Sequence, residues 1–161
     1  MPLVTRGIVA MAGAFGYELN PRTLTDAEKA EVREQIALYH RFERLIRQGV
    51  YYRLTEETRP YAGWAFVAPD RSEALVSIVI TELEANDGFP YLKLRGLDPD
   101  KLYTAECCGG ALFGADGPMT ALPRPVPGAA LMYGGYVFDN MRGDFPGCQI
   151  YFREAGRAEG L

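Results

Sequence analysis

The stretch of sequence that decides the fold lies at the start of the chain and is Pro2-Leu3-Val4-Thr5-Arg6-Gly7-Ile8-Val9-Ala10-Met11-Ala12-Gly13-Ala14-Phe15-Gly16-Tyr17-Glu18-Leu19. From Val4 to Ala12, small and apolar residues recur at helical spacing, and Gly13 is a typical stop signal. The segment from Ala14 to Leu19 is short and largely apolar, which predicts a strand buried on both faces, as in a parallel barrel. We therefore expect a helix that leads into an inner barrel strand.

A second, longer helix is predicted from Asp26 to Gln48. Its start is a capping box, in which the Thr25 hydroxyl accepts from the Glu28 amide while the Glu28 carboxylate reaches back. Gly49 is the expected residue just beyond its C-terminus. The apolar residues that should cover one broad face are Val32, Ile36, Leu38, Tyr39, Phe42, Leu45 and Ile46. The residues expected on an opposite, solvated face are Arg33, Arg41, Arg44 and Arg47.

The hydrophobic period changes from 3.6 to 2 after Gly49, and turn signals then separate short runs rich in aromatic and β-branched residues. This pattern predicts an antiparallel sandwich over residues 50–161, after a barrel remnant over residues 1–49. Residues 106–130 show no clear period and are expected to form a long surface loop. The predicted strands are Tyr51–Leu54, Trp64–Ala68, Ala74–Leu83, Tyr91–Leu97, Leu102–Ala105, Gly135–Phe138 and Cys148–Arg153.

Composition excludes several classes of function. The 161 residues carry a formal net charge of -4, whereas nucleic-acid binding needs a basic field. No apolar run is long enough for a membrane helix, and the start lacks a secretory pattern, so we expect a cytoplasmic protein. Cys107, Cys108 and Cys148 lack the spacing of a zinc site, and His40 lies far from them. We therefore expect no metal and no cofactor, with the thiols reduced.

Several motifs, in the same order and at similar spacing, resemble the C-terminal portion of α-galactosidases of glycoside hydrolase family 36. The resemblance begins with Thr5-Arg6-Gly7, continues through Phe15 to Leu19 and covers the helix from Thr25 to Ile46. It extends more weakly to the C-terminus, through Asp70 to Val76, Leu94 to Pro99, Ala130 to Gly135 and Gly143 to Phe145. It implies a mainly β fold with N-terminal helices, in which an antiparallel β-sandwich follows a helix-strand-helix remnant of a (β/α)8 barrel.

The resemblance also implies a chemistry, that of a retaining α-galactosidase acting on melibiose-type and raffinose-type sugars. Such enzymes use two carboxyl groups about 5 Å apart across the sugar, one as nucleophile and one as acid. In this family both are aspartates on earlier barrel strands, and no segment of this chain matches those strands. We therefore expect no catalytic residue here, an inactive isolated chain, and the remainder of the barrel as its partner.

Three residues are candidates for substrate binding. Tyr17 and Glu18 lie near the end of the predicted barrel strand, where active sites of this architecture form. They would line or buttress a galactose pocket in a full barrel, and support of the strand-to-helix junction is the preferred interpretation. Trp64 opens a strand with aromatic neighbours. It would either stack on a sugar in a carbohydrate-binding module or fill the sandwich core, and the core is preferred.

A third interpretation treats the chain as an interaction module. The helix from Asp26 to Gln48 would expose its apolar stripe if the barrel is missing. Such a face favours dimerisation or swapping, so a homo-oligomer through this helix is an alternative.

Overall fold

The computed structural model describes residues 1–56, 59–82, 89–110, 122–138, 141 and 144–157. Two helices, α1 (Leu3–Ala10) and α2 (Asp26–Gln48), precede the strands. The main sheet has six strands in the order β1-β2-β3-β8-β5-β6, and its strand pairs are antiparallel. These strands are β1 (Val50–Arg53), β2 (Tyr61–Val67), β3 (Glu73–Ile80), β5 (Lys101–Gly110), β6 (Val126–Pro127) and β8 (Gly147–Arg157).

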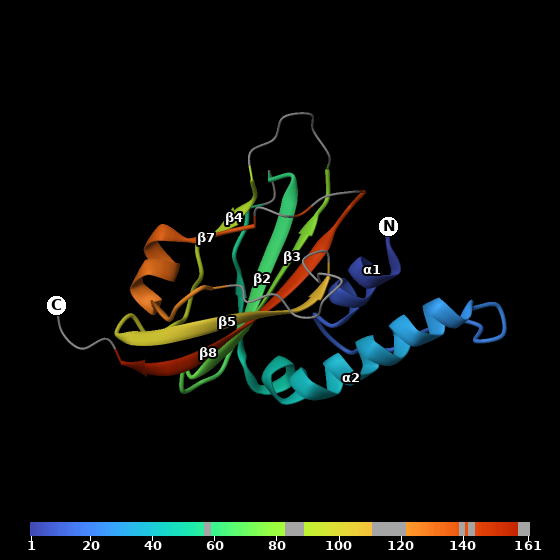
Figure 1. Cartoon of the computed structure of the whole chain (residues 1–161), viewed down its shortest axis with the longest axis horizontal. Helices are drawn as coiled ribbons and strands as arrows, with labels where there is room; N and C mark the ends of the chain where they lie inside the picture. The colour runs from blue at the N-terminus through green and yellow to red at the C-terminus, as the bar shows by residue number, and fades with distance from the viewer. Residues whose placement is uncertain (57–58, 83–88, 111–121, 139–140, 142–143, 158–161) are drawn as a thin grey trace.

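A different layer covers each face of the main sheet. Helices α1 and α2 lie on one side, while a small sheet of β4 (Tyr91–Leu92) and β7 (Tyr136–Val137) lies on the other with the π-helix η1 (Ala130–Gly134) (Figure 1). The sequence prediction of a mainly β fold, an antiparallel sandwich preceded by helices, is confirmed.

Side chains of the central strands alternate between two separate hydrophobic cores, one on each face of the main sheet. On β3, Val76 and Ile78 enter the core under the small sheet, together with Ile150 and Phe152 of β8. Leu75 and Val79, on either side of this pair, belong to the other core, which the helices cover. This period-2 alternation explains why almost every residue of β2 and β3 is buried, since both faces of the sheet are covered.

Helix α2 begins as the sequence predicts. Thr25 is its N-cap and forms the full capping box with Glu28. The helix also ends at Gly49 as predicted, but for a different physical reason. Gly49 is extended, with φ -71° and ψ 159°, and does not adopt the left-handed conformation of a helix C′ glycine. A side chain at Gly49 would instead collide with the carbonyl oxygen of Leu45. Gly49 is therefore required for space, because α2 runs directly into β1.

The segment Ala14–Leu19, where the sequence predicts an inner barrel strand, is paired with no strand of the described residues. An inner barrel strand is held by ladder hydrogen bonds from both neighbouring strands, so the described residues do not test this prediction. Aromatic packing holds the segment: the Phe15 ring stacks on Tyr39 at 4.9 Å between centroids and meets Tyr17 edge-on at 5.1 Å.

Two strand predictions need revision. The prediction ended a strand at Ala105, but β5 continues to Gly110, so the start of the expected loop is sheet. A bulge between Cys107 and Gly109 allows the glycines to remain paired with β8. The alternating run from Tyr91 pairs only as far as Leu92. Residues 111–121 of the predicted loop and Leu83 lie outside the described residues.

Over the described ranges, no helix is both long and apolar enough to cross a membrane. The same ranges contain no group of three or more His, Cys, Asp or Glu side chains placed to hold a metal ion.

Candidate functional site at the helix–sheet junction

The motif residues of the first helix and the segment after it converge on one buried side chain, Gln35 of α2. The Tyr17 hydroxyl donates to Oε1 of Gln35, and Nε2 of Gln35 donates to the Leu3 carbonyl at 3.3 Å and to Glu31 Oε1 at 3.1 Å. Gln35 is only 6% exposed. A side chain at Gly7 would overlap the Gln35 amide, so this glycine makes room for it. The sequence analysis missed Gln35, although a polar residue at helical spacing from Phe42 signals a buried polar contact.

Tyr17 and Glu18, the two predicted barrel-site residues, have different environments. Tyr17 is half-buried, and burial followed by the nearby Glu31 carboxylate raises the pKa of its phenol. Glu18 is exposed to solvent. The observed contacts of Tyr17 connect the segment after α1 to α2, which is the geometry of a supporting residue. The structure does not bring Glu18 into this network.

Thr5 connects the same junction to the main sheet. Its side chain is fully buried, and its hydroxyl donates to the backbone carbonyl of Phe145 at 2.9 Å, just before β8. The first residue of β8 is Gly147, and a methyl group there would press against Ile8 and Thr5 at 3.1 and 3.2 Å. The absence of a side chain at Gly147 therefore lets α1 pack closely on the start of β8.

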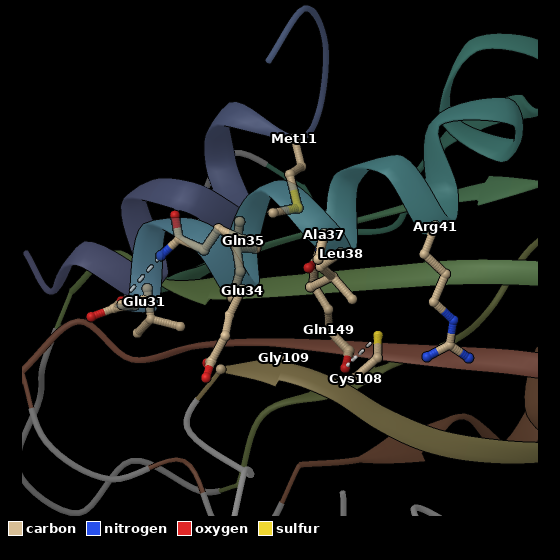
Figure 2. A pocket seen from close by; sticks show the side chains of 13 residues that line it. Met11, Glu31, Glu34, Gln35, Ala37, Leu38, Arg41, Cys108, Gly109 and Gln149 are labelled. Carbon is tan, nitrogen blue, oxygen red and sulfur yellow. Dashed lines mark hydrogen bonds between the residues drawn. The ribbon is translucent and has the colours of Figure 1, made fainter. Parts of the chain in front are cut away.

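A cavity of about 660 Å³ lies between the two helices and the ends of β5 and β8 (Figure 2). Its wall is largely apolar, with Ile8 and Met11 from α1 and Leu38 from α2. Polar groups enter from Glu34 of α2 and from Gln149 of β8, which Figure 2 shows below the helix.

Gln149 is the most unusual polar residue in this cavity wall. It is 1% exposed, and its Nε2 donates to the Ser77 hydroxyl at 3.1 Å. Among the described residues, its Oε1 has no hydrogen-bond partner. Its backbone carbonyl accepts from the Cys108 thiol at 3.4 Å. A buried acceptor without a donor lowers the stability of the fold. The Oε1 atom of Gln149 is therefore a position in the cavity wall that could accept a hydrogen bond from an N–H or O–H group.

The charges beside the cavity are mostly negative. Burial raises the pKa of Glu31, the hydrogen bond from Gln35 opposes that shift, and the neighbouring Glu34 and Glu28 carboxylates add to it. Arg41 also lines the cavity, but it is paired with Glu106 of β5 and lies over the Tyr151 ring at 5.3 Å. The cavity therefore offers apolar surface and acceptors, a combination suited to packing or to a ligand that donates hydrogen bonds.

All four arginines predicted on the solvated face are exposed, and two of them also pair with the sheet. Besides Arg41, Arg44 reaches the sheet, where it pairs with Glu73 of β3. The Tyr151 hydroxyl donates to the other carboxylate oxygen of Glu73 at 2.6 Å. Burial and then this hydrogen bond raise the pKa of Tyr151 to about 12. Because α2 packs against the sheet, the long side chains beside its apolar stripe reach the strands while their charged ends stay in solvent.

Trp64 does not lie where a sugar would stack on it. It is 7% exposed and packs in the core between the sheet and the helices. Phe66, at 6%, is in the same core, while Tyr61 enters the core on the opposite face. Tyr51 is 54% exposed, but it lies on β1 with its ring against the edge of Phe66. These aromatic residues are divided between two cores and the surface, so they form no shared platform.

The comparisons with known proteins agree with this arrangement of helices and sheet. The model described as "Glycosyl hydrolase family 36 C-terminal domain" matches residues 61–152, and the model described as "Melibiase" matches residues 1–49. The first match contains every buried residue of the core under the small sheet, and the second contains α1, α2 and the Gln35 network. This chain therefore belongs to glycosyl hydrolase family 36.

Individual relatives are similar over nearly the whole chain. The bifunctional α-galactosidase/sucrose kinase AgaSK of Mediterraneibacter gnavus is 41% identical over 95% of this chain and 15% of its own length. The solved galactosidase domain of AgaSK superposes with a TM-score of 0.81 at 39% identity, covering 96% of this chain and 20% of that one. A double variant of the family 36 α-galactosidase AgaA from Geobacillus stearothermophilus, solved in complex with raffinose, superposes with a TM-score of 0.80 at 35% identity, with the same two coverages, 96% and 20%. The chain thus spans only about a fifth or less of these proteins.

Proposed function

We propose that this chain is the C-terminal region of a retaining α-galactosidase. In that role α1, the extended segment and α2 complete a catalytic barrel, and the six-stranded sheet supports them from outside. The observation that carries the proposal is the shared core. Phe42 and Leu45 of α2 and Ile8 of α1 are buried against the sheet, which holds the two helices in fixed relation.

The proposed substrates are α-galactosides of the melibiose and raffinose type. The raffinose complex of the Geobacillus stearothermophilus relative supports this class. Retaining hydrolysis requires a nucleophilic carboxylate and an acid on opposite sides of the glycosidic bond. The resemblance places both on earlier barrel strands, so the chain by itself should hydrolyse no α-galactoside. Its proposed contribution to activity is to hold the end of the barrel in place.

A segment exchange tests both parts of the proposal. The 161 residues replace the matching segment of the Geobacillus stearothermophilus enzyme, and hydrolysis of a chromogenic α-galactoside is measured. We expect turnover by the chimera and none by the isolated chain. A chimera carrying Gly7→Leu is the matched control, because the larger side chain should displace Gln35 and lower activity. A folded but inactive chimera would contradict the assignment, and turnover by the isolated chain would contradict its inactivity.

The remainder of the barrel is the proposed partner of the two helices. Apolar side chains remain exposed on both of them, with Val9 44% and Ile36 38% accessible. We propose that these residues contact the rest of the barrel in the whole enzyme, and that they favour self-association when the chain is alone. Light scattering after gel filtration should give a mass above that of one chain. The double variant Val9→Lys, Ile36→Lys should restore the monomer, and a monomeric parent chain would contradict the proposal.

A further inference from the structure

Two of the three cysteines lie side by side across neighbouring strands. The sulfur of Cys107 on β5 is 3.9 Å from the sulfur of Cys148 on β8. Both are free thiols, 1% and 0% exposed, and both belong to the core under the small sheet. They are 41 residues apart in the chain, so only the fold brings them together. A disulfide needs the sulfurs at about 2 Å, which requires an inward shift of about 2 Å here.

The β-bulge in β5 explains this proximity. Cys107 pairs with Ile150, but after the bulge Gly110 pairs with Cys148. Cys107 and Cys148 are therefore diagonal neighbours on the same face of the sheet. Bulges bend the strand that carries them, which brings such diagonal side chains closer. The intervening Cys108 points to the opposite face, where it joins the helix-side core.

The chemical environment distinguishes the three thiols. The hydrogen bond with Cys148 lowers the pKa of the Cys107 thiol, while the same bond, together with burial, raises the pKa of Cys148. A thiolate is the form that reacts with oxidants, and the lowered pKa favours Cys107 in that role. Burial raises the pKa of Cys108 to about 12, which keeps this third thiol protonated.

The pair also lies near one end of the ladder between β5 and β8. The pairing of Gly110 with Cys148 is the last rung of the β5–β8 ladder. The terminal rungs of a sheet fray with less free energy than its centre requires. A small oxidant reaches the thiols through such openings, whereas a bulky one would need wider separation of the strands.

We propose that Cys107 and Cys148 are an oxidation site, at which a peroxide converts the two thiols into a reversible disulfide that links β5 to β8. The Cys107 thiolate attacks one oxygen of hydrogen peroxide, the O–O bond breaks, and the departing hydroxide takes a proton to become water. The resulting sulfenic acid is then attacked by the Cys148 sulfur, the S–S bond forms, and the S–O bond breaks to release a second water. Two thiols lose two electrons, and the two peroxide oxygens are reduced.

Peptide mapping tests the site directly. The folded chain is treated with hydrogen peroxide, the remaining peroxide is removed with catalase, and the chain is then unfolded in N-ethylmaleimide and digested. We expect a peptide containing Cys107 linked to one containing Cys148, lighter by about 2 Da than the sum of the two and separated by dithiothreitol. Cys108 should remain a free thiol. Met1, which is 68% exposed, reports whether peroxide was effective. Oxidised Met1 without the linked peptides, or a link through Cys108, would overturn the proposal.

Two variants separate a specific pair from general thiol oxidation. Cys108→Ser should form the same link to the same extent as the parent chain. Cys148→Ser should stop at a sulfenic acid on Cys107, detected as an adduct with dimedone. If Cys148→Ser does not fold, peptide mapping of Cys108→Ser is sufficient by itself. Absence of a disulfide between Cys107 and Cys148 in that variant would overturn the proposal. The readout involves no α-galactosidase activity, so its result is independent of the proposed function.

Discussion

The hydroxyl of Thr5 donates to the backbone carbonyl of Phe145 at 2.9 Å, and this contact joins the first helix to the entrance of the last strand, 140 residues away. Thr5→Val keeps the shape of the side chain but leaves that carbonyl without its donor. We expect the free energy of unfolding to fall by about 1–3 kcal/mol in urea titrations. Thr104→Val is the matched control, because Thr104 makes a similar but exposed contact with the Arg153 carbonyl at 3.3 Å. Equal effects at the two positions would contradict a special role for Thr5.

Gly7→Ala should destabilise the chain although it improves helix propensity. Alanine is favoured over glycine in a helix by about 1 kcal/mol, but the new methyl group would overlap the Gln35 amide. We expect a net loss of about 1–3 kcal/mol from overpacking. Gly13→Ala, where a methyl group meets nothing within 4 Å, should change stability by less than about 0.5 kcal/mol. Thermal melts of the two variants decide the question, and a stabilising Gly7→Ala would show that Gln35 moves aside freely.

Tyr151 should make the protein less stable in alkaline solution. Its pKa is raised from 10.0 to about 12 in the folded chain, so folding favours the protonated phenol. This contribution is fully present below pH 10 and is lost as the pH rises toward 12. Tyr17 and Tyr103 shift in the same direction, so the comparison must be made with Tyr151→Phe. Unfolding free energies measured from pH 8 upward should decline more steeply in the parent chain than in Tyr151→Phe, and parallel curves would contradict the assignment.

The Gln149–Ser77 pair is suited to a double-mutant cycle. Ser77→Ala alone leaves the Gln149 amide nitrogen without its acceptor and should cost about 1–3 kcal/mol. Gln149→Met with Ser77→Ala removes both partners and also the unpaired Oε1, so the double variant should be close to neutral. Urea unfolding of the four proteins measures the coupling. Additive losses would mean that Ser77 and Gln149 do not depend on each other for stability.

Most of the architecture was predictable because its signals are local. The capping box at Thr25 and Glu28 marks the start of α2 within the sequence itself, and the change of period after Gly49 marks the first strand. The extension of β5 was missed because Cys107 to Gly110 contains two glycines and lacks alternation. Pairing with β8 across the bulge, a long-range contact, is what makes it a strand.

The candidate site was less predictable, because its contacts depend on partners distant in the chain. Tyr17 was identified from its place near a barrel strand, but its partner Gln35 emerges only when α1 and α2 pack together. Arg41 is exposed as the helical pattern predicts, but its partner Glu106 lies on β5 and could not be identified from the sequence. The sequence analysis preferred a core position for Trp64, and Trp64 is buried. A large apolar side chain on a strand face that a helix covers is shielded from solvent.

The absence of a linker between α2 and β1 limits where this chain can be truncated and where it can recombine. The change of sequence pattern at Gly49 suggests a domain boundary at which the chain could be truncated. However, Trp64, Phe66 and Leu75 are covered by residues that precede this boundary. A chain beginning at residue 50 would expose that whole face and should be insoluble. Recombination during evolution would meet the same obstacle, so exchanges that preserve a working protein should carry the two helices and the sheet together as one cassette.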